Sequence, residues 1–354
     1  MDRLEHRRPW LISGVPRATP HGGPLRARHL FADLAERTGA KTLPHFGGRG
    51  LPRALAAWHF KRAQLASTEL IDPHTLRLLS MRVTPEALDL HDSPVEHLDA
   101  LGLPLSAGER RRVERMVTAN YAAFGRIVVQ SAAFAELATV PEHQRITIPN
   151  GTDTRHIRAH RLSDAPVVVT MSGAAPGRGL ELMVEAMKEV RSIYPDSTLR
   201  MGLVPTGRTS AQYLEQLRRL CRRLTWVEIV SVPYASLSPF LAEARVFAIP
   251  HPPHPYWDAI LPIKLFDGLA SGRPLATTPR TETASLVRGA DAGLVASGDM
   301  AVDLAAVIGH LLNDDRLSSK LGARGRLAAE SRYDWRVLSA ALADAVLGPQ
   351  NASR

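Results

Sequence analysis

Hydrophobic and polar positions in the second half of the chain follow two alternating patterns. Short and nearly continuous apolar runs, such as residues 167–171 and 246–249, are typical of parallel strands that are covered on both faces. Between these runs, in residues 180–193 and 211–224, apolar side chains recur every three to four positions, which predicts amphipathic helices. Regular alternation of strands and helices predicts an α/β fold with a doubly wound parallel sheet and right-handed crossovers.

The first half of the chain carries the same alternation less regularly. A helical pattern fills residues 51–65 and 106–123, and no element can be assigned to residues 67–86. Apolar runs predict strands over residues 10–13, 41–46, 87–91, 126–131 and 146–149. Since the 354 residues exceed what one core usually spans, two domains are expected.

Composition narrows the class of protein. The 45% hydrophobic and 22% charged residues are typical of a soluble globular protein. No apolar run approaches the roughly 20 residues that span a bilayer, and the charged start of the chain lacks the apolar core of a secretion signal, which predicts a cytoplasmic protein. The single cysteine, Cys221, excludes an internal disulfide and a cysteine-based metal site, and its leucine neighbours predict a buried structural thiol.

Basic residues are concentrated at the start of the chain. Residues 1–62 hold twelve Lys or Arg against four Asp or Glu, which gives +8 of the formal net charge of +9. Such a segment suits an anionic membrane surface, a phosphorylated acceptor or a nucleic acid, and solvated arginines on an ordinary surface explain it equally well. Because no nucleic-acid motif accompanies the charge and aromatic residues make up 5%, we rank a membrane or lipid-linked acceptor before a nucleic acid.

The stretch from Pro262 to Pro274 carries the clearest chemical signal and reads P-I-K-L-F-D-G-L-A-S-G-R-P. Its apolar positions predict a short helix that ends at Gly272. Lys264 and Asp267, three positions apart, lie on one side of the first turn. Backbone N–H groups at the helix start and Lys264 attract an anion, and Asp267 can accept hydrogen bonds from a sugar hydroxyl. The helix therefore suits a phosphate beside a ribose, although a surface ion pair gives the same pattern.

Further candidates follow predicted strands. Residues 172–179, S-G-A-A-P-G-R-G, lie between a strand and a helix and contain one cation, Arg178, which can bind a diphosphate through two hydrogen bonds. Gly22 and Gly23 come after the first strand, which is a weaker signal because two glycines mark any tight turn. His91 stands at the carboxyl end of a strand, where open α/β sheets bind ligands, although a histidine can also simply cap the strand.

The stretch P-x-K-L-F-D-x-L-A-S-G-x-P resembles the nucleotide-sugar signature of glycosyltransferases with the GT-B architecture, most closely the retaining family four, or glycosyl transferases group 1. I-P-N-G-T-D is similar to the family's I-P-N-G-V-D, with Thr152 in the place of valine. The resemblance implies two facing Rossmann-like, doubly wound domains with parallel sheets and an interdomain cleft. Residues 1–160 would form the acceptor domain, residues 161–332 the donor domain, and residues 333–354 a helix that crosses back.

The resemblance also implies roles for the candidate residues. Asp267, where the family usually has glutamate, would bind the ribose, and Lys264 and Arg178 would stabilise the leaving diphosphate as catalytic residues. His91 would be a third catalytic residue, near the transferred sugar. The other expected donor contacts are Gly22, Gly23, Ser172, Gly173, Val232, Tyr234, Asp258, Ile260 and Leu265.

One departure from the family pattern concerns the donor sugar. The family has an acidic residue eight positions before the ribose-binding one, and counting back from Asp267 gives Ala259. Asp258 stands one place off, so either the loop is shifted by one residue, or the contact is missing or made by the backbone. This leaves the identity of the sugar open.

These features predict a metal-independent, retaining hexosyltransferase that moves a sugar from a UDP-sugar or GDP-sugar to a glycan, lipid-linked or small-molecule acceptor. We expect peripheral contact with an anionic membrane at its inner face and no nucleic-acid partner. No cofactor or metal is expected: His251 and His254 are three apart, but no third ligand is evident and prolines argue against a helix there. Two alternatives stay open, a GT-B-fold nucleotide-sugar isomerase or hydrolase, and a non-catalytic binder of an anionic ligand or nucleic acid.

Overall fold

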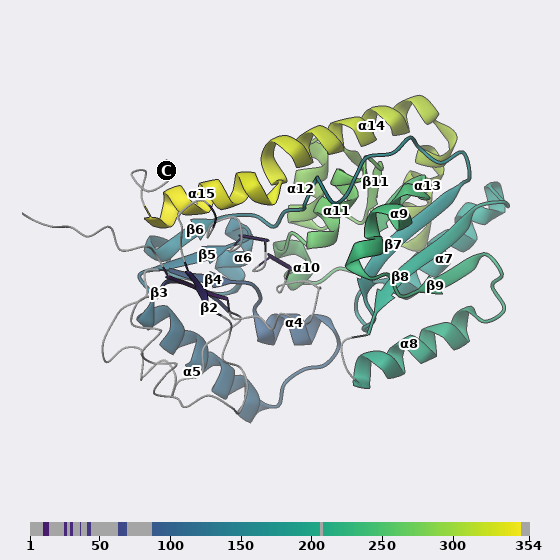
Figure 1. Cartoon of the computed structure of the whole chain (residues 1–354). Coiled ribbons are helices and arrows are strands. Elements are labelled where there is room, and N and C mark those ends of the chain that lie inside the picture. Colours follow the sequence, from purple (N-terminus) through teal and green to yellow (C-terminus); the bar gives the residue numbers. More distant parts are fainter. Residues whose placement is uncertain are drawn as a thin grey trace, which may run out of the picture. The chain divides into compact units, whose positions relative to one another are not determined.

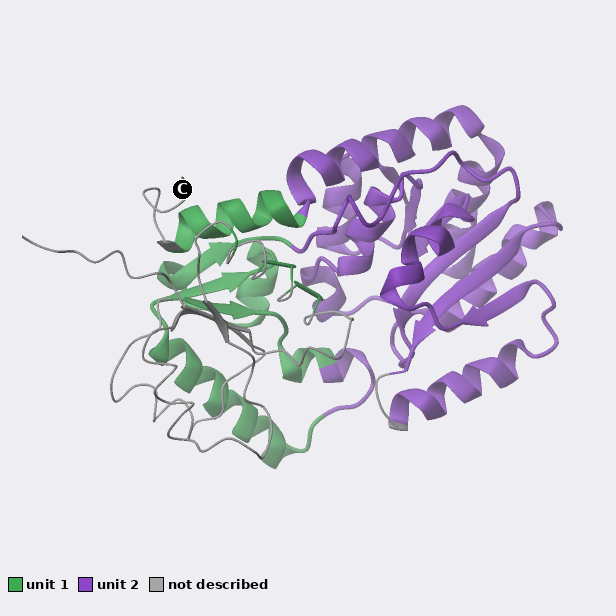
Figure 2. Ribbon diagram, viewed as in Figure 1, with its two compact units in different colours: residues 1–97, 105–149, 335–354 green, residues 98–104, 150–334 purple. Residues whose placement is uncertain are grey.

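The structure is a computed structural model that describes residues 10–13, 25–26, 29–30, 36, 41–43, 63–68, 87–205 and 208–347. The chain divides into two compact units (Figure 2): Met1–His97, Leu105–Pro149 and Trp335–Arg354 form the first, and Leu98–Pro104 and Asn150–Asp334 form the second. Each unit contains a six-stranded sheet, and every strand pair in both sheets is parallel. The predicted α/β class is therefore confirmed.

The sheet of the first unit has the strand order β2-β1-β3-β4-β5-β6. Figure 1 labels strands β2 to β6 of this sheet. Its strands are β1 (Trp10–Ser13), β2 (Lys41–Leu43), β3 (Ala63–Thr68), β4 (Ala87–Leu90), β5 (Arg126–Val129) and β6 (Arg145–Thr147). The helices described in this part of the chain are α4 (Pro94–Ala100), α5 (Ala107–Ala123), α6 (Ala132–Leu137) and, from the end of the chain, α15 (Trp335–Leu347). All four residues of β4 are buried, which places this strand in the core of its unit.

Helix α5 begins where its sequence provides a capping box. The Ser106 hydroxyl accepts a hydrogen bond from the backbone N–H of Glu109, and the Glu109 carboxylate accepts one from the backbone N–H of Ser106 at 2.9 Å. Both backbone donors would otherwise lack a partner at the helix start, so the motif fixes where the helix begins.

The sheet of the second unit has the order β12-β11-β10-β7-β8-β9. Its strands are β7 (Val167–Gly173), β8 (Thr198–Val204), β9 (Val227–Val230), β10 (Val246–Ile249), β11 (Leu275–Thr277) and β12 (Gly293–Val295). Its helices are α7 (Leu180–Ile193), α8 (Arg208–Cys221), α9 (Leu237–Ala242), α10 (Pro255–Ala259), α11 (Ile263–Ala270), α12 (Thr281–Gly289), α13 (Ala301–Asn313) and α14 (Asp315–Ala328), followed by one π-helical turn, Ala329–Tyr333. Strands β7 and β10 are neighbours, so the loops that follow them meet at one edge of the sheet.

Two apolar clusters cover the faces of this second sheet. Neighbouring strand residues alternate between them: Val168 and Val246 pack with α7, α8 and α13, and Val169 and Phe247 pack with α9, α11 and α12. This alternation follows from the period of two along a strand. Cys221 is buried in the first cluster, as predicted, and burial raises the pKa of its thiol.

Strand β3 corrects the sequence-based assignment. The pattern predicted a helix up to residue 65 and left residues 67–86 unassigned, whereas Ala63–Thr68 is a strand that pairs with β1 on one side and β4 on the other. Its sequence, A-Q-L-A-S-T, is poor in β-branched and aromatic residues. Pairing with two neighbours within the sheet therefore overrides a weak local preference.

The loop between β7 and α7 depends on Gly179, which generates a test of the fold. Its φ is +75°, and a Cβ there would lie 1.6 Å from the carbonyl oxygen of Pro250, at the end of β10. We predict that Gly179→Ala lowers the free energy of unfolding by about 2–4 kcal/mol, because it combines a steric clash with a strained backbone. Thermal unfolding of the purified variant measures the loss.

The matched control for this substitution is Gly289→Ala, in the same unit. Gly289 ends α12, and a Cβ there would have no heavy atom within 4 Å. Its change in unfolding free energy should stay within about 1 kcal/mol, the range of helix propensities. Equal losses in the two variants would contradict the close packing of the loop against β10.

Candidate active site

The glycine-rich loop after β7 places Arg178 over an aromatic ring. Gly177 and Gly179 flank the arginine, and both have positive φ values, +70° and +75°. The guanidinium carbon of Arg178 lies 5.3 Å from the centroid of the Trp257 ring, a cation–π distance. Two glycines in the left-handed region thus turn the loop so that its cation lies against α10.

Lys264 brings a second cation to the same place. It lies in the first turn of α11, and although part of its side chain is exposed, its Nζ is buried without a hydrogen-bond partner among the residues that the structure describes. Burial, and then the charge of Arg178, hold the pKa of Lys264 well below its ordinary value. The two predicted diphosphate-binding cations therefore lie close enough to repel each other.

His251 is a third nitrogen group in this cluster, and sequence reasoning gave it no role. It follows β10, is fully buried, and stacks on the Trp257 ring at 4.3 Å. Burial, followed by the charges of Lys264, Arg178 and Arg280, lowers the pKa of His251 well below its ordinary value, so the ring is neutral. Neither ring nitrogen has a hydrogen-bond partner in the described part of the chain.

This grouping is suited to an anion. Burying Lys264 beside Arg178 is unfavourable because the charges lose hydration and repel each other. A ligand with two or more negative charges would relieve both effects. The N-terminus of α11 adds backbone N–H groups that favour negative charge.

Asp267, the predicted ribose ligand, lies one turn further along α11. It is 5% exposed, and its Oδ1 accepts a hydrogen bond from the Thr152 hydroxyl at 2.9 Å. Burial raises the pKa of Asp267 to about 7, although the Thr152 hydrogen bond acts in the opposite direction. The carboxyl group is thus a polar group in a nearly dry position, one helical turn from Lys264.

Asp258 lies in α10, and its position corrects the expectation that prolines prevent a helix here. Pro255 is the first residue of α10, where the missing N–H has no intrahelical partner to lose, and Nδ1 of His254 caps the helix by accepting from the N–H of Tyr256. The carboxylate of Asp258 accepts a hydrogen bond from the N–H of Thr281 at 3.2 Å, at the start of α12. In this structure Asp258 therefore caps a helix.

The other predicted donor contacts of the second unit have varied surroundings. Leu265 and Ile260 are buried, and Leu265 packs in the apolar core. Tyr234 stacks on His156 at 4.4 Å, and its carbonyl oxygen is 2.8 Å from Nε2 of the same histidine. Val232 packs against the core from its edge.

The remaining predicted contacts lie in two glycine-containing segments. Gly173 lies next to Arg178, and Ser172 has a buried hydroxyl without a hydrogen-bond partner among the described residues. Gly22 and Gly23 lie outside the described residues.

In the first unit, His91 belongs to a buried polar network that the sequence did not reveal. Its Nε2 is 3.0 Å from Oδ2 of Asp89, and the Arg26 guanidinium binds the same carboxylate at 2.9 Å. Arg26 also donates to the carbonyl oxygens of Ile148 and Pro149 at 2.9 and 2.8 Å. Burial alone would raise the pKa of Asp89, but Arg26 and His91 hold it below its ordinary value, so Asp89 stays ionised and orients His91. A lone aspartate inside the apolar run A-L-D-L was the available signal.

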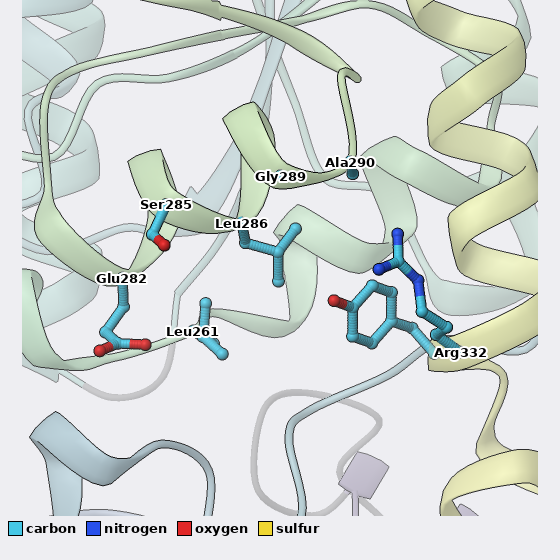
Figure 3. Close-up of a pocket in the computed structure, with 8 residues that line it drawn as sticks. Leu261, Glu282, Ser285, Leu286, Gly289, Ala290 and Arg332 are labelled. Atoms are coloured by element: carbon cyan, nitrogen blue, oxygen red, sulfur yellow. The ribbon is translucent and has the colours of Figure 1, made fainter.

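A separate pocket of about 300 Å³ lies beside α12 (Figure 3). Its lining residues are Leu261, Glu282, Ser285, Leu286, Gly289, Ala290, Arg332 and Tyr333. Figure 3 shows Glu282 on one side of it and Arg332 on the other, with Leu261 and Leu286 between them. Neither Arg178 nor Lys264 lines it, so this pocket is distinct from the cation cluster.

No group of three or more His, Cys, Asp or Glu that could hold a metal ion occurs within the described ranges. The two histidines noted in the sequence as a possible metal pair make different contacts: His251 stacks on Trp257, and His254 caps α10.

Comparison with known proteins finds relatives that use nucleotide sugars, in agreement with the arrangement of the site. Residues 165–314 match the family model described as glycosyl transferases group 1. A GDP-mannose-dependent alpha-(1-6)-phosphatidylinositol monomannoside mannosyltransferase from Mycolicibacterium smegmatis is 28% identical over 247 residues, which cover 68% of this chain and 62% of the relative. The enzyme of the same description from Mycobacterium tuberculosis is 27% identical over 222 residues, 58% of this chain and 56% of the relative. The matched stretches thus span about three fifths of these relatives.

Solved structures match over nearly the whole chain. Sucrose-phosphate synthase from Thermosynechococcus elongatus has a TM-score of 0.71 at 17% identity and covers 98% of this chain and 100% of its own. The Anabaena protein HepE, solved with UDP and glucose, has a TM-score of 0.73 at 15% identity, with 96% and 99% covered. The resemblance indicated by the sequence is therefore confirmed: the chain shares the GT-B fold of these structures, and its residues 165–314 match the family model of glycosyl transferases group 1.

Proposed function

We propose that this protein is a glycosyltransferase that moves a hexosyl group from a nucleoside diphosphate sugar to an acceptor. The observation that carries the proposal is the buried ammonium group of Lys264, close to the half-buried Arg178, with the buried carboxyl group of Asp267 one turn further along the same helix. A diphosphate would lie at the cations and a ribose at the carboxyl group, which is the arrangement that a sugar nucleotide requires.

The proposed mechanism follows from where charge develops. When the bond between the anomeric carbon and the phosphate oxygen breaks, negative charge grows on the diphosphate. That charge is stabilised by Arg178, Lys264 and the N–H groups at the start of α11. Because the ammonium group of Lys264 is shielded from water, its electrostatic interaction is stronger than in solvent. His91, held by Asp89, is proposed to act near the sugar, and retention of the anomeric configuration is part of the proposal.

The donor and acceptor are proposed from the relatives. Those described above are named as GDP-mannose-dependent and as acting on a phosphatidylinositol monomannoside, so GDP-mannose and a lipid-linked acceptor are the first pair to assay. UDP-glucose is the second donor, since the HepE structures hold UDP or UDP-glucose. An isomerase or hydrolase would instead consume the donor without an acceptor.

Lys264→Met tests the role of the buried cation. The substitution keeps most of the unbranched side chain and removes its charge, so we predict that kcat/KM falls by about 10²–10³, the range lost with one electrostatic contact to the transition state. Unfolding free energy should not fall, because an ammonium group buried without a partner is itself unfavourable. Steady-state kinetics and thermal unfolding measure the two effects.

The matched control is Lys188→Met, which removes an exposed lysine paired with Glu185 on α7 and should leave both quantities unchanged. Full activity of Lys264→Met would refute the proposed diphosphate site. Retained nucleic-acid binding in Lys264→Met, lost as salt rises, would favour a non-catalytic binder.

Asp267→Asn is expected to change stability and nucleotide affinity in opposite directions. The carboxyl group has a pKa of about 7 in the folded protein against 3.8 in its ordinary state, so the folded state loses stability as pH rises from about 4 through 7. Since asparagine does not ionise, the variant should become more stable than the unchanged protein above pH 7, by up to about 4 kcal/mol at 1.36 kcal/mol per pKa unit. Nucleotide affinity should fall by about tenfold or more, because a charge-assisted hydrogen bond is lost.

Urea unfolding at pH 5 and pH 8, together with nucleotide titrations, measures both effects. Asp164→Asn, at a fully solvated aspartate, is the control and should show no change that depends on pH. A stability gain that is the same at both pH values would contradict the raised pKa.

We also propose peripheral contact with an anionic membrane, which would bring a lipid-linked acceptor to the enzyme. The described residues include no helix that is both long and apolar enough to cross a bilayer. Helix α5 exposes several arginines, among them Arg111, Arg112 and Arg115. Exposed basic residues near an anionic surface contribute about 1 kcal/mol each.

Vesicle sedimentation tests this contact. The protein should bind vesicles that contain phosphatidylglycerol and not those of phosphatidylcholine alone, and binding should weaken with salt. Reversal of two charges, Arg111→Glu with Arg112→Glu, should lower binding by about tenfold or more. Absence of binding to anionic vesicles at low salt would refute the membrane contact and leave the proposed activity unaffected.

A further inference from the structure

Residues 150–154 begin the long segment of the second unit, and every second residue among them is held by hydrogen bonds. The Asn150 side chain donates to the carbonyl oxygen of Leu261 at 2.7 Å, in the loop before α11. Thr154 binds the carboxylate of Asp334 through its hydroxyl and its N–H. Between them, the N–H of Thr152 donates to the carbonyl oxygen of Tyr333 at 3.0 Å. The backbone of Thr152 therefore has little freedom.

The side chain of Thr152 uses this fixed position to bind one oxygen of a site residue. Its hydroxyl donates to Oδ1 of Asp267 at 2.9 Å, and the two side chains are 1% and 5% exposed. For the other oxygen of Asp267, Oδ2, the described part of the chain contains no hydrogen-bond donor partner. The hydrogen bond thus restricts rotation of the carboxyl group and leaves Oδ2 for a ligand.

We propose that Thr152 is the positioning residue that lets Asp267 recognise a ribose hydroxyl of the bound nucleotide. The inference rests on the proposed function. The Thr152 hydroxyl holds the carboxyl group in one rotamer, and Oδ2 accepts the ribose hydroxyl. Because a hydrogen bond to the charged form favours ionisation, the same contact supports the carboxylate that such acceptance requires.

Thr152 and Asp267 both differ from the residues that the family pattern has at their positions, which is consistent with the two side chains acting together. Thr152 replaces the valine of the related I-P-N-G-V-D pattern, and Asp267 replaces the usual glutamate. Aspartate is one methylene shorter, so its carboxyl group lies nearer to its own backbone. In this chain that position is within hydrogen-bond distance of the Thr152 hydroxyl, which a valine would lack.

The test compares ribose recognition in variants at residue 152. GDP and UDP are titrated against the unchanged protein, and the one that binds is paired with its 2′,3′-dideoxy analogue. Thr152→Val keeps the shape of the side chain and removes the donor. We expect its affinity for the ribonucleotide to fall by about tenfold to a hundredfold, the loss expected for a hydrogen bond to a charged group, with little change for the dideoxy analogue.

Thr152→Ser restores the hydroxyl and should restore discrimination between the two nucleotides. A role in folding alone would lower both affinities together, so parallel losses in Thr152→Val would overturn the inference, as would unchanged discrimination. If the unchanged protein binds neither GDP nor UDP, the proposed function itself fails. Thermal unfolding of each variant confirms that the compared proteins are folded.

Discussion

The buried ammonium group of Lys264, held close to the guanidinium of Arg178, is the constraint on which the site of the second unit depends. Arg178 lies in the loop after β7, and Lys264 lies in α11, which comes after β10; burial, and then the charge of Arg178, lowers the pKa of Lys264. The arrangement requires a tight turn at Gly179, a ring to support the guanidinium at Trp257, and a helix that starts at a fixed place. Apolar clusters on both faces of the sheet supply the stability that offsets this repulsion.

Burial disfavours the charged form of three titratable groups of the site. Burial lowers the pKa values of Lys264 and His251, and it raises that of Asp267 to about 7. Each shift has the same origin, since a medium of low polarity disfavours the charged form of an acid and of a base alike. The proposed sugar nucleotide carries phosphates and hydroxyl groups, which are the partners that these groups require in place of water.

The sequence predicted this fold well where local pattern and tertiary structure agree. The continuous apolar run of β7, the glycine-rich loop and the amphipathic α7 were all recognised, because each has its own periodicity or turn chemistry. Strand β3 was missed, since its small residues carry no strand signal and its pairing with β1 and β4 is a property of the whole sheet.

The site was predicted in part for a similar reason. Lys264 and Asp267 share one helix turn, so their spacing was visible. Contacts between residues far apart in sequence left no local trace: Thr152 is 115 positions from Asp267, and Arg26 is 63 positions from Asp89. His251 had been considered only as a metal ligand, because stacking on Trp257 and burial among cations arise from the packing of two loops.

The division of the chain has a consequence for its synthesis. Apart from residues 98–104, the second unit is one continuous segment, Asn150–Asp334, whereas the first unit takes in Trp335–Arg354. Within that unit Trp335 stacks on His29, and Arg126 donates to the carbonyl oxygen of Ala345. The first unit therefore cannot be complete until the ribosome has translated α15. By then every residue of the second unit has already been made. The second unit can thus become complete before the first, although most of the first unit is translated earlier.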